Sequence, residues 1–464
     1  MSGTLFDVAA EADDPADPSL GTSLETENQS QPRGGLSPRL YSVVWRWHFY
    51  AGLITAPILW LVTITGALYV FRGELTSWRD RALLEVEPGS SRMSYDRLRE
   101  IAIEVLGTKE LDGMHVRPGE GHSVRFTADD APPTAAKGEH HHRHVYIDPY
   151  RGTVLGSRVE EEDFFAVVLE LHRSMLMGWP GRILTELATG WAIVLTATGL
   201  YLWWPRGKSN VGVWAPRMRG KLYAVLRDWH AVGGAYFTAL IALVAGTGLF
   251  FTLVWGTGFN KTAQKAGHWP AKWFGVPKSE PHAPGAPPAS LDRIVEAALA
   301  RSRPDDGLAM RLDVKPDDAY KAWLMRDEDK NSLRMVNVDQ YSARTLDVVD
   351  NTGVPFLYKV RLWAVSIHMG QIFGTPTKIL ALITTLIVFG LSATGAWMWW
   401  RRRPQGRAGF PRRPAAGILP RWGWAIIAVS GIAMPVVGAS ILLILLLDFA
   451  LTSHLGRSAR PRPA

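Results

Sequence analysis

Five blocks of apolar residues set the strongest limit on what this chain can fold into. Each reaches the roughly 20 residues that a helix needs to cross a hydrocarbon core of about 30 Å. Hydrophobic residues make up 47% of the 464 and gather in these blocks instead of spreading evenly. The sequence therefore predicts an integral membrane protein. The blocks cover about residues 47–71, 183–204, 231–255, 378–400 and 423–447.

Lysine and arginine positions predict how these helices cross the membrane. The 205–221 loop carries three arginines and two lysines, the 401–421 loop carries seven arginines, and neither contains Asp or Glu. By the positive-inside rule these two loops and the N-terminus are cytoplasmic, which places 72–182 and 259–377 in the periplasm. The net charge of +8 is thus a topology signal, and we expect no nucleic-acid partner. This topology puts the C-terminal tail, which carries Arg457, on the periplasmic side.

The chain contains no cysteine. This excludes disulfides, iron–sulfur clusters held by thiolates, and haem attached through a C-x-x-C-H motif. Any redox cofactor must therefore be bound non-covalently. With 13 histidines in the sequence, histidine is the natural ligand for a metal or a haem iron.

The two halves of the chain repeat one another at two offsets. The first offset is 182: Trp47-His48, Gly52 and Thr65-Gly66 match Trp229-His230, Gly234 and Thr247-Gly248. The second is 196: His172, Gly178, Pro180, Arg182, Thr198-Gly199 and Trp203-Trp204 match His368, Gly374, Pro376, Lys378, Thr394-Gly395 and Trp399-Trp400. Each half thus has a span, a periplasmic insert and a second span, and we expect the halves to be related by an axis along the membrane normal.

The periplasmic inserts resemble each other. Each has a helix-like segment, Tyr95–Leu106 or Leu291–Arg301, followed by strand-like runs. The last runs, Val145–Ser157 and Val336–Asp350, alternate and then turn at Asp-Pro-Tyr or Asp-Gln-Tyr. We therefore expect two small α+β modules. The predicted organisation is a disordered cytoplasmic tail (1–38), helix 1 (39–71), module 1 (72–163), a juxtamembrane helix and helix 2 (164–204), a cytoplasmic loop (205–221), helix 3 (222–258), module 2 (259–355), a juxtamembrane helix and helix 4 (356–402), a second loop (403–421), helix 5 (422–448) and a tail (449–464).

Four histidines form two predicted layers. His48 and His230 lie at the cytoplasmic starts of spans one and three, and His172 and His368 precede spans two and four. The 23 residues from His48 to Phe71 rise roughly 35 Å as a helix, so the layers are expected near opposite faces. Two imidazoles at equal depth suit a haem iron with two histidine ligands, and filled coordination favours electron transfer over oxygen chemistry. An isolated histidine at this depth would more often be an interfacial amphipathic residue, but the paired recurrence favours ligands.

Residues near these histidines complete the candidate cofactor sites. Glycines four or six residues after a histidine would let a flat macrocycle approach the backbone, and nearby cations would meet its propionates. The candidate glycines are Gly52, Gly234, Gly178 and Gly374, and the candidate cations are Arg46, Arg173, Arg182, Arg227 and Lys378.

Two other groups of polar residues need interpretation. Consecutive residues on a strand or loop point in different directions, so we interpret the histidine cluster of the first insert as a solvated loop. Glu186 lies well inside a span, where carboxylates often carry protons or ions. Its repeat counterpart is Leu382 and Arg182 is one turn away, so we expect a carboxylate paired with Arg182. The histidine cluster comprises Glu139, His140, His141, His142 and His144.

Over about residues 40–402 the chain resembles the PepSY-associated transmembrane family, which includes iron-regulated membrane proteins and inner-membrane ferric-siderophore reductases. The motifs that carry this resemblance are WHFYAG, WHAVGG, LHRSMLMGWPGR, IHMGQIFGTPTK and VYIDPYRGTVLG. The second module departs from the pattern, with Asp-Gln-Tyr-Ser-Ala where Asp-Pro-Tyr-x-Gly is usual. The resemblance implies haem ligation at the four histidines and one-electron reduction in the periplasm. The expected fold is an α-helical membrane protein with about five transmembrane helices in two pseudo-symmetric halves, plus two PepSY-like α+β periplasmic modules.

The leading functional hypothesis is a bacterial inner-membrane oxidoreductase with two haem b groups that reduces a periplasmic ferric siderophore or another ferric chelate. Reduction to Fe(II) weakens binding to hard oxygen donors and would release the iron. No nucleotide-binding fingerprint is present, so the electron donor would be a quinol or a separate reductase. Two alternatives remain. One is a non-redox PepSY protein that binds a periplasmic partner, and the other is a transporter built on parallel repeats.

Overall fold

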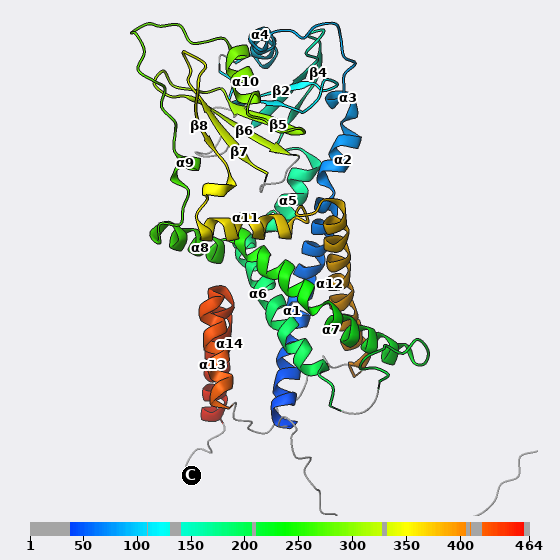
Figure 1. The fold of residues 1–464 in the computed structure, drawn as a ribbon. Coiled ribbons are helices and arrows are strands. Elements are labelled where there is room, and N and C mark those ends of the chain that lie inside the picture. The colour runs from blue at the N-terminus through cyan, green and yellow to red at the C-terminus, as the bar shows by residue number, and fades with distance from the viewer. Residues whose placement is uncertain are drawn as a thin grey trace, which may run out of the picture.

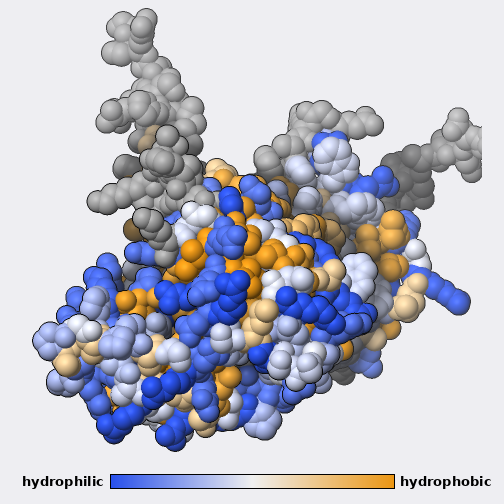
Figure 2. Space-filling model, turned by 90° about the horizontal axis from the view of Figure 1, so that it is seen from above, coloured by the Kyte–Doolittle hydropathy of each residue, from blue (hydrophilic) through white to orange (hydrophobic). Residues whose placement is uncertain are grey.

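The computed structural model describes residues 38–108, 110–129, 141–206, 210–326, 332–404, 409 and 420–458. A β-sheet domain stands on a bundle of long helices (Figure 1). Viewed from the sheet end, hydrophilic residues cover most of the surface around an apolar stretch, as suits a domain outside the bilayer (Figure 2). We call the end of the bundle next to this domain the sheet side and the opposite end the far side. The predicted disordered tail lies almost entirely outside the described residues.

Four long apolar helices form the bundle. They are α1 (Pro38–Val70), α6 (Gly178–Trp203), α7 (Leu222–Gly248) and α12 (Thr375–Arg402). Within the described residues, these are the helices long and apolar enough to cross a membrane. Helices α1 and α7 each pack against both α6 and α12. Consequently α1 and α7 lie diagonally across the bundle.

The predicted fifth span does not form one crossing helix. The chain breaks at Met434 into α13 (Arg421–Ala433) and α14 (Pro435–Ser458). Pro435 has no N–H to continue the hydrogen-bond ladder of α13, and 13 residues of helix rise only about 20 Å. The two helices pack closely where glycines meet, because a Cβ on Gly431 would lie 3.1 Å from the Gly438 Cα.

This hairpin changes the expected position of the chain end. Helices α13 and α14 lie side by side, and α14 ends on the far side, level with the start of α1 (Figure 1). Trp191 of α6 donates to the Ser440 hydroxyl of α14 at 3.1 Å, and Trp255 donates to the Ala433 carbonyl at 2.9 Å. The end of α14 therefore does not lie on the sheet side, where the five-span topology placed it.

Shorter helices lie between the bundle and the sheet (Figure 1). Helix α5 (Phe164–Ser174) packs against α1 and α6, and α11 (Phe356–His368) packs against α7. Each leads directly into a span, as the sequence predicts for the two juxtamembrane helices. The remaining short elements are α2 (Arg72–Arg79), α3 (Arg81–Leu84), α8 (Val254–Lys265), α9 (Ala271–Phe274) and the 3₁₀ turns η1 (Leu249–Phe251) and η2 (Asn351–Gly353).

The two inserts build one continuous sheet instead of two separate modules. The first contributes β1 (Gly113–Val116), β2 (Val124–Asp129), β3 (His142–Ile147) and β4 (Val154–Val159), and the second contributes β5 (Asp306–Arg311), β6 (Tyr320–Arg326), β7 (Arg334–Val338) and β8 (Thr345–Val349). The strand order is β4-β3-β2-β1-β5-β6-β7-β8. Antiparallel pairing of β1 with β5, with Met114 opposite Met310, joins the inserts. This pairing satisfies backbone groups that an isolated module would expose at its edge.

Helices α4 (Tyr95–Leu106) and α10 (Leu291–Leu299) cover one face of this sheet, and their positions agree with the predicted helices. They share one apolar core with the strands, centred on Leu98, Phe126 and Ile294. The two helices also cap each other. The Asp96 carboxylate accepts the Leu291 N–H at 3.0 Å, and the Asp292 carboxylate accepts the Tyr95 N–H at 2.9 Å.

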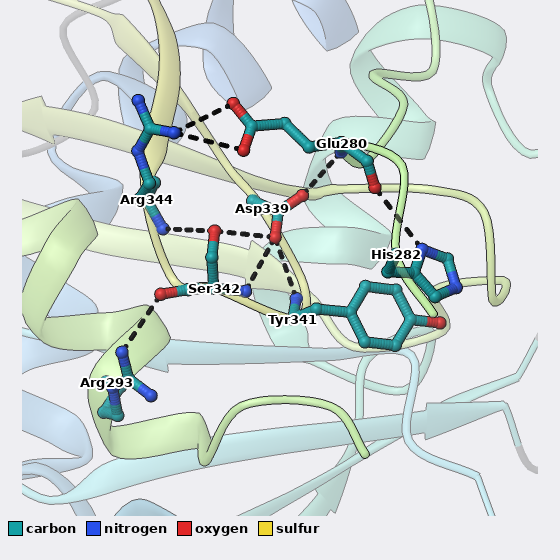
Figure 3. A network of polar contacts seen from close by, with 7 residues as sticks. All are labelled: Glu280, His282, Arg293, Asp339, Tyr341, Ser342 and Arg344. Carbon is teal, nitrogen blue, oxygen red and sulfur yellow. Dashed lines mark hydrogen bonds and ion pairs between the residues drawn. The ribbon is translucent and has the colours of Figure 1, made fainter. Parts of the chain in front are cut away.

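The predicted Asp-x-Tyr turns connect β3 to β4 and β7 to β8. In the first, Asp148 accepts the backbone N–H of Tyr150 at 2.7 Å. In the second, Asp339 accepts the N–H groups of Tyr341 and Ser342 at 3.0 and 2.7 Å, and that of Glu280 at 2.7 Å (Figure 3). Burial alone would raise the pKa of Asp339, but these donors lower it to about 2. The second module therefore keeps the turn despite its different sequence.

The sheet face opposite α4 and α10 points toward the bundle, and we call it the underside. In the second half of the sheet, Trp323 and Met335 pack there against Trp273 of α9 and against Tyr358 and Leu362 of α11. This apolar contact fixes α11, and with it His368, relative to the sheet.

Candidate functional site

The four predicted histidines meet as two pairs. His48 on α1 and His230 on α7 have ring centroids 6.4 Å apart. His172 at the end of α5 and His368 at the end of α11 have ring centroids 6.3 Å apart. In each pair one ring comes from the first half of the chain and the other from the second, as the repeat predicts.

The two pairs occupy different depths of the bundle. The Nδ1 atoms of His172 and His368 lie 2.9 Å from the carbonyl oxygens of Val62 on α1 and Val244 on α7. Val62 follows His48 by 14 residues, and Val244 follows His230 by the same number. At 1.5 Å per residue both helices place the pairs about 21 Å apart. His48 and His230 form the far-side pair, and His172 and His368 form the sheet-side pair.

Threonine hydroxyls orient the far-side pair. His48 Nδ1 lies 2.9 Å from Thr198 Oγ1, and His230 Nδ1 lies 3.1 Å from Thr394 Oγ1. Each hydroxyl already donates its proton to a carbonyl one turn earlier, at 2.7 Å. The oxygen is therefore left to accept, so Nδ1 carries the hydrogen and Nε2 keeps its lone pair.

Backbone carbonyls orient the sheet-side pair. A carbonyl oxygen can only accept, so the bonds to Val62 and Val244 also put the hydrogen of His172 and His368 on Nδ1. Burial lowers the pKa of His172 to about 4, and the neighbouring His368 ring adds to this shift. Burial likewise lowers the pKa of His368. Both rings are therefore neutral near pH 7, with Nε2 available as a metal ligand.

Glycines make room for all four rings. A Cβ on Gly66 would lie 3.1 Å from the Cε1 atom of His172, and one on Gly248 would lie 3.0 Å from that of His368. The corresponding distances are 3.2 Å from Gly199 to His48 and 3.5 Å from Gly395 to His230. Each glycine follows the threonine of a Thr-Gly dipeptide that recurs in the sequence repeat. From the sequence alone, these dipeptides can be recognised only as part of the repeat. Their recurrence at the same offsets as the histidines is the feature that could have indicated a role beside the rings.

The separation within each pair fits a single metal ion between the rings. A metal–imidazole bond of about 2.0 Å at each end, plus about 1.2 Å from each nitrogen to its ring centre, gives ring centroids about 6.4 Å apart. Two imidazoles supply only two ligands. Within the described residues, no group of three or more His, Cys, Asp or Glu side chains is placed to hold a metal ion. A haem, whose macrocycle supplies the other four nitrogens, fits this donor set.

The cations expected near the propionates have varied surroundings. Arg227 is paired with Asp228 at 2.7 Å, and Lys378 with Glu74 at 2.6 Å. The Arg46 guanidinium lies 5.7 Å from the centre of the Tyr50 ring. Arg173 and Arg182 make no ion pair with any residue that the structure describes.

The glycines expected beside a macrocycle lie at contacts between spans or at the starts of spans. A Cβ on Gly52 would touch Leu195 of α6 at 3.7 Å, and one on Gly234 would touch Leu391 of α12 at 3.7 Å. These two glycines therefore set the spacing between neighbouring spans. Gly178 and Gly374 have positive φ, and a Cβ at either position would meet no described atom within 4 Å. Gly178 is the first residue of α6, and Gly374 directly precedes α12.

The histidine cluster of the first insert forms ordinary polar contacts. His142 bonds to Glu161 at 3.1 Å. His144 bonds to Thr127 at 2.9 Å and lies 3.3 Å from Glu160. Glu139 and His140 lie outside the described residues.

Glu186 does not pair with Arg182 as expected. It is buried, and its two carboxylate oxygens accept the backbone N–H groups of Val254 and Trp255 at 2.7 and 2.9 Å. These are among the first N–H groups of α8, which have no partner within that helix. Glu186 therefore caps α8 from α6, and Leu382 has no equivalent task.

The fold and site define a multi-pass membrane protein with a PepSY-like sheet domain and two intramembrane or juxtamembrane histidine pairs. The sequence matches the PepSY-associated TM region over residues 45–402. The chain therefore belongs to this family. No curated protein matches the sequence closely enough to add a more specific comparison.

Proposed function

We propose that this protein is a bacterial inner-membrane oxidoreductase with two haem b groups that carries electrons across the bilayer and reduces a ferric siderophore on the sheet side. The observation that supports this best is the pair of neighbouring imidazoles at each of two depths, with ring centroids 6.4 and 6.3 Å apart. Each ring has its Nδ1 hydrogen bonded and its Nε2 available. Hydrogen bonds of this kind fix the orientation and basicity of haem-ligating histidines.

A bound haem would supply one-electron chemistry at each depth. The chain's own residues would hold it there: His48 and His230 on the far side, and His172 and His368 on the sheet side. Since each pair would supply two imidazole ligands to a bound group, it would leave no open site for oxygen, which favours electron transfer. The bonds from Nδ1 to Thr198, Thr394, Val62 and Val244 keep the rings from turning away between redox states.

The direction of transfer follows from the charges of the loops. The helix ends that flank the 205–221 and 401–421 loops lie on the far side, and these loops are rich in positive residues. We therefore assign this side to the cytoplasm and the sheet domain to the periplasm. One electron from the cytoplasmic side would convert a periplasmic Fe(III) chelate to Fe(II), which hard oxygen donors hold less tightly. The electron donor would be a quinol or a separate reductase.

The direct test is a pyridine haemochrome assay on the purified full-length protein, with oxidised and dithionite-reduced visible spectra. We expect about two b-type haems per chain, each with the spectrum of a low-spin iron bound by two histidines. Absence of haem from protein expressed with adequate haem supply would refute the proposal. It would leave either a PepSY membrane protein that binds a partner or a transporter.

A further inference from the structure

Helix α11 has two apolar faces. One face packs against the underside of the sheet through Tyr358 and Leu362. The other face is formed by apolar residues three or four positions apart, which lie on one side of a helix. Two of its aromatic side chains are 67% and 49% exposed, so the described part of the chain covers this second face only in part. Its residues are Phe356, Val360, Trp363 and Ile367.

A cavity of about 370 Å³ lies along this second face. It is bounded by α11 and by Thr247 and Phe250 at the end of span α7. The Phe250 ring contacts Trp255 and Phe259 of α8, with ring centroids 4.8 Å from each. Neither histidine of the sheet-side pair lines the cavity. The cavity is therefore distinct from the space between the two imidazoles.

The cavity lies at the depth where the spans end. Span α7 ends at Gly248, and α11 lies between the spans and the sheet (Figure 1). Because Phe356 and Trp363 line the cavity and are also exposed, it opens at the surface of the molecule. Exposed aromatic residues at the end of a span mark the level where lipid headgroups meet the hydrocarbon core. An apolar cavity that opens here therefore faces lipid acyl chains.

Lys359 adds a positive charge to the wall of the cavity. It is half-buried, and its ammonium group has no ion-pair or hydrogen-bond partner among the residues that the structure describes. Its counterpart in the repeat, 196 residues earlier, is Asp163, which pairs with Arg79 and Arg158. A lysine can lay its apolar stem along such a wall and carry its charge to the headgroup level. The second half of the chain thus presents a cation to the membrane surface where the first half has a carboxylate held by two arginines.

We propose that this cavity binds an anionic phospholipid of the sheet-side leaflet, with part of one acyl chain along α11 and the phosphate against the Lys359 ammonium. Its volume is within the range of small-molecule sites, about 300–1,000 Å³. Basic pockets beside membrane helices bind anionic lipid headgroups in this way. A lipid held here would add contacts to α11, which ends at His368. The inference goes beyond the proposed function and does not depend on haem.

The experiment measures lipid binding to the purified full-length protein by native mass spectrometry. Phosphatidylglycerol and phosphatidylcholine with the same acyl chains are titrated separately, and we expect phosphatidylglycerol to bind more tightly. Lys359→Gln should weaken phosphatidylglycerol binding by about tenfold, because hydrogen bonds to charged groups are strong, and should change phosphatidylcholine binding by less than about twofold. The control is Lys261→Gln on α8. It removes the same charge from an exposed position that does not line the cavity and should stay within about twofold of wild type.

A second variant, Val360→Trp, tests the acyl-chain part of the site. The larger side chain occupies the cavity and should weaken binding of both lipids. Equal phosphatidylglycerol affinity in Lys359→Gln and Lys261→Gln, equal affinity of wild type for the two lipids, or unchanged binding by Val360→Trp overturns the inference. Haem content of the same preparations shows that each variant is folded, and if Val360→Trp does not fold, Lys359→Gln alone decides.

Discussion

Beneath the sheet, the second half of the chain packs Trp323 and Met335 onto α9 and α11, whereas the first half presents His115 and Arg125. The strands are the same in number and pairing, so the difference lies in the side chains. The apolar underside of the second half holds α9 and α11 in place. The first half instead contacts α2 and α3, which follow span α1, through bonds such as that from Ser123 to the Leu83 carbonyl. The comparison teaches that the two halves of the sheet are fixed to the membrane helices by different kinds of contact.

At the histidines the two halves agree instead. Each half supplies one ring to each pair, and each ring has a Thr-Gly dipeptide beside it. A site that needs the same side chain from each half of the chain, such as a metal held by two histidines, requires both copies of the repeat to stay alike at those positions. Glu186 is the opposite case, because it caps α8 while its counterpart Leu382 caps nothing.

The largest expected effect comes from breaking one histidine pair at a time. His48→Ala or His230→Ala should remove the far-side haem and spare the other, because the two pairs share no ligand. His172→Ala or His368→Ala should remove the sheet-side haem and stop reduction of a ferric chelate, while the remaining haem can still be reduced from the far side. Haem content per chain measures the first effect.

The predicted loss of ferric-chelate reduction in the His172 and His368 variants is measured by stopped-flow absorbance on vesicles of known orientation. A ferric siderophore is confined to the sheet side, and a ferrous-specific dye reports iron release. If variants without the sheet-side haem reduced the chelate as fast as wild type, the siderophore-reductase proposal would fail and only a membrane haem protein would remain. If one substitution removed all haem from protein that still inserts, the pairing itself would be wrong.

A smaller effect is expected from the threonines of the far-side pair. Thr198→Val and Thr394→Val keep the side-chain shape but remove the acceptor of His48 or His230 Nδ1. Loss of a hydrogen bond to a metal-ligating histidine typically lowers metal affinity by about 10- to 100-fold, so the far-side haem should be lost more readily in competition with apomyoglobin.

The matched control for these variants is Thr196→Val on the same helix. Among the described residues, the Thr196 hydroxyl bonds only to the Ala192 carbonyl one turn away, and its loss should leave haem retention unchanged. Equal haem loss in Thr196→Val and Thr198→Val would mean that the threonines act through helix stability and not through the imidazole.

The sequence predicted those parts of the fold that have their own local pattern. The length of the apolar segments identified the four spans of the bundle. The periodicity of apolar residues, together with turn residues, identified α4, α10 and the β3–β4 and β7–β8 hairpins. The repeat predicted which histidines would pair, because equal offsets imply equal depth. The hairpin of α13 and α14 was missed because 423–447 is long enough to span, and only Pro435 signals the break.

Contacts between distant segments were not predictable in the same way. Pairing of β1 with β5 depends on two strand edges about 200 residues apart, and no local pattern records it. The cap that Glu186 provides for α8 is similar, since proximity in sequence favoured Arg182 as its partner. Both contacts form because segments that are far apart in the sequence have complementary surfaces in the folded chain.

The smallest expected effect concerns the turns that the two modules share. Gly152 in the first turn has φ +67, and Ala343 in the second has φ +59. A left-handed conformation costs an ordinary residue about 1–2 kcal/mol, and a Cβ on Gly152 would lie 2.9 Å from the Met93 Sδ atom. Gly152→Ala should therefore destabilise the protein by at least about 1 kcal/mol, whereas Ala343→Gly should stabilise it by about 0.5 kcal/mol, since the greater freedom of glycine in the unfolded chain offsets part of the gain. Thermal unfolding of the full-length protein in detergent, followed by tryptophan fluorescence, measures both shifts. If Gly152→Ala lowers the unfolding temperature and Ala343→Gly raises it, the two modules share one turn in which only the second is strained. If Ala343→Gly lowers it instead, the packing of the Ala343 methyl group outweighs the strain.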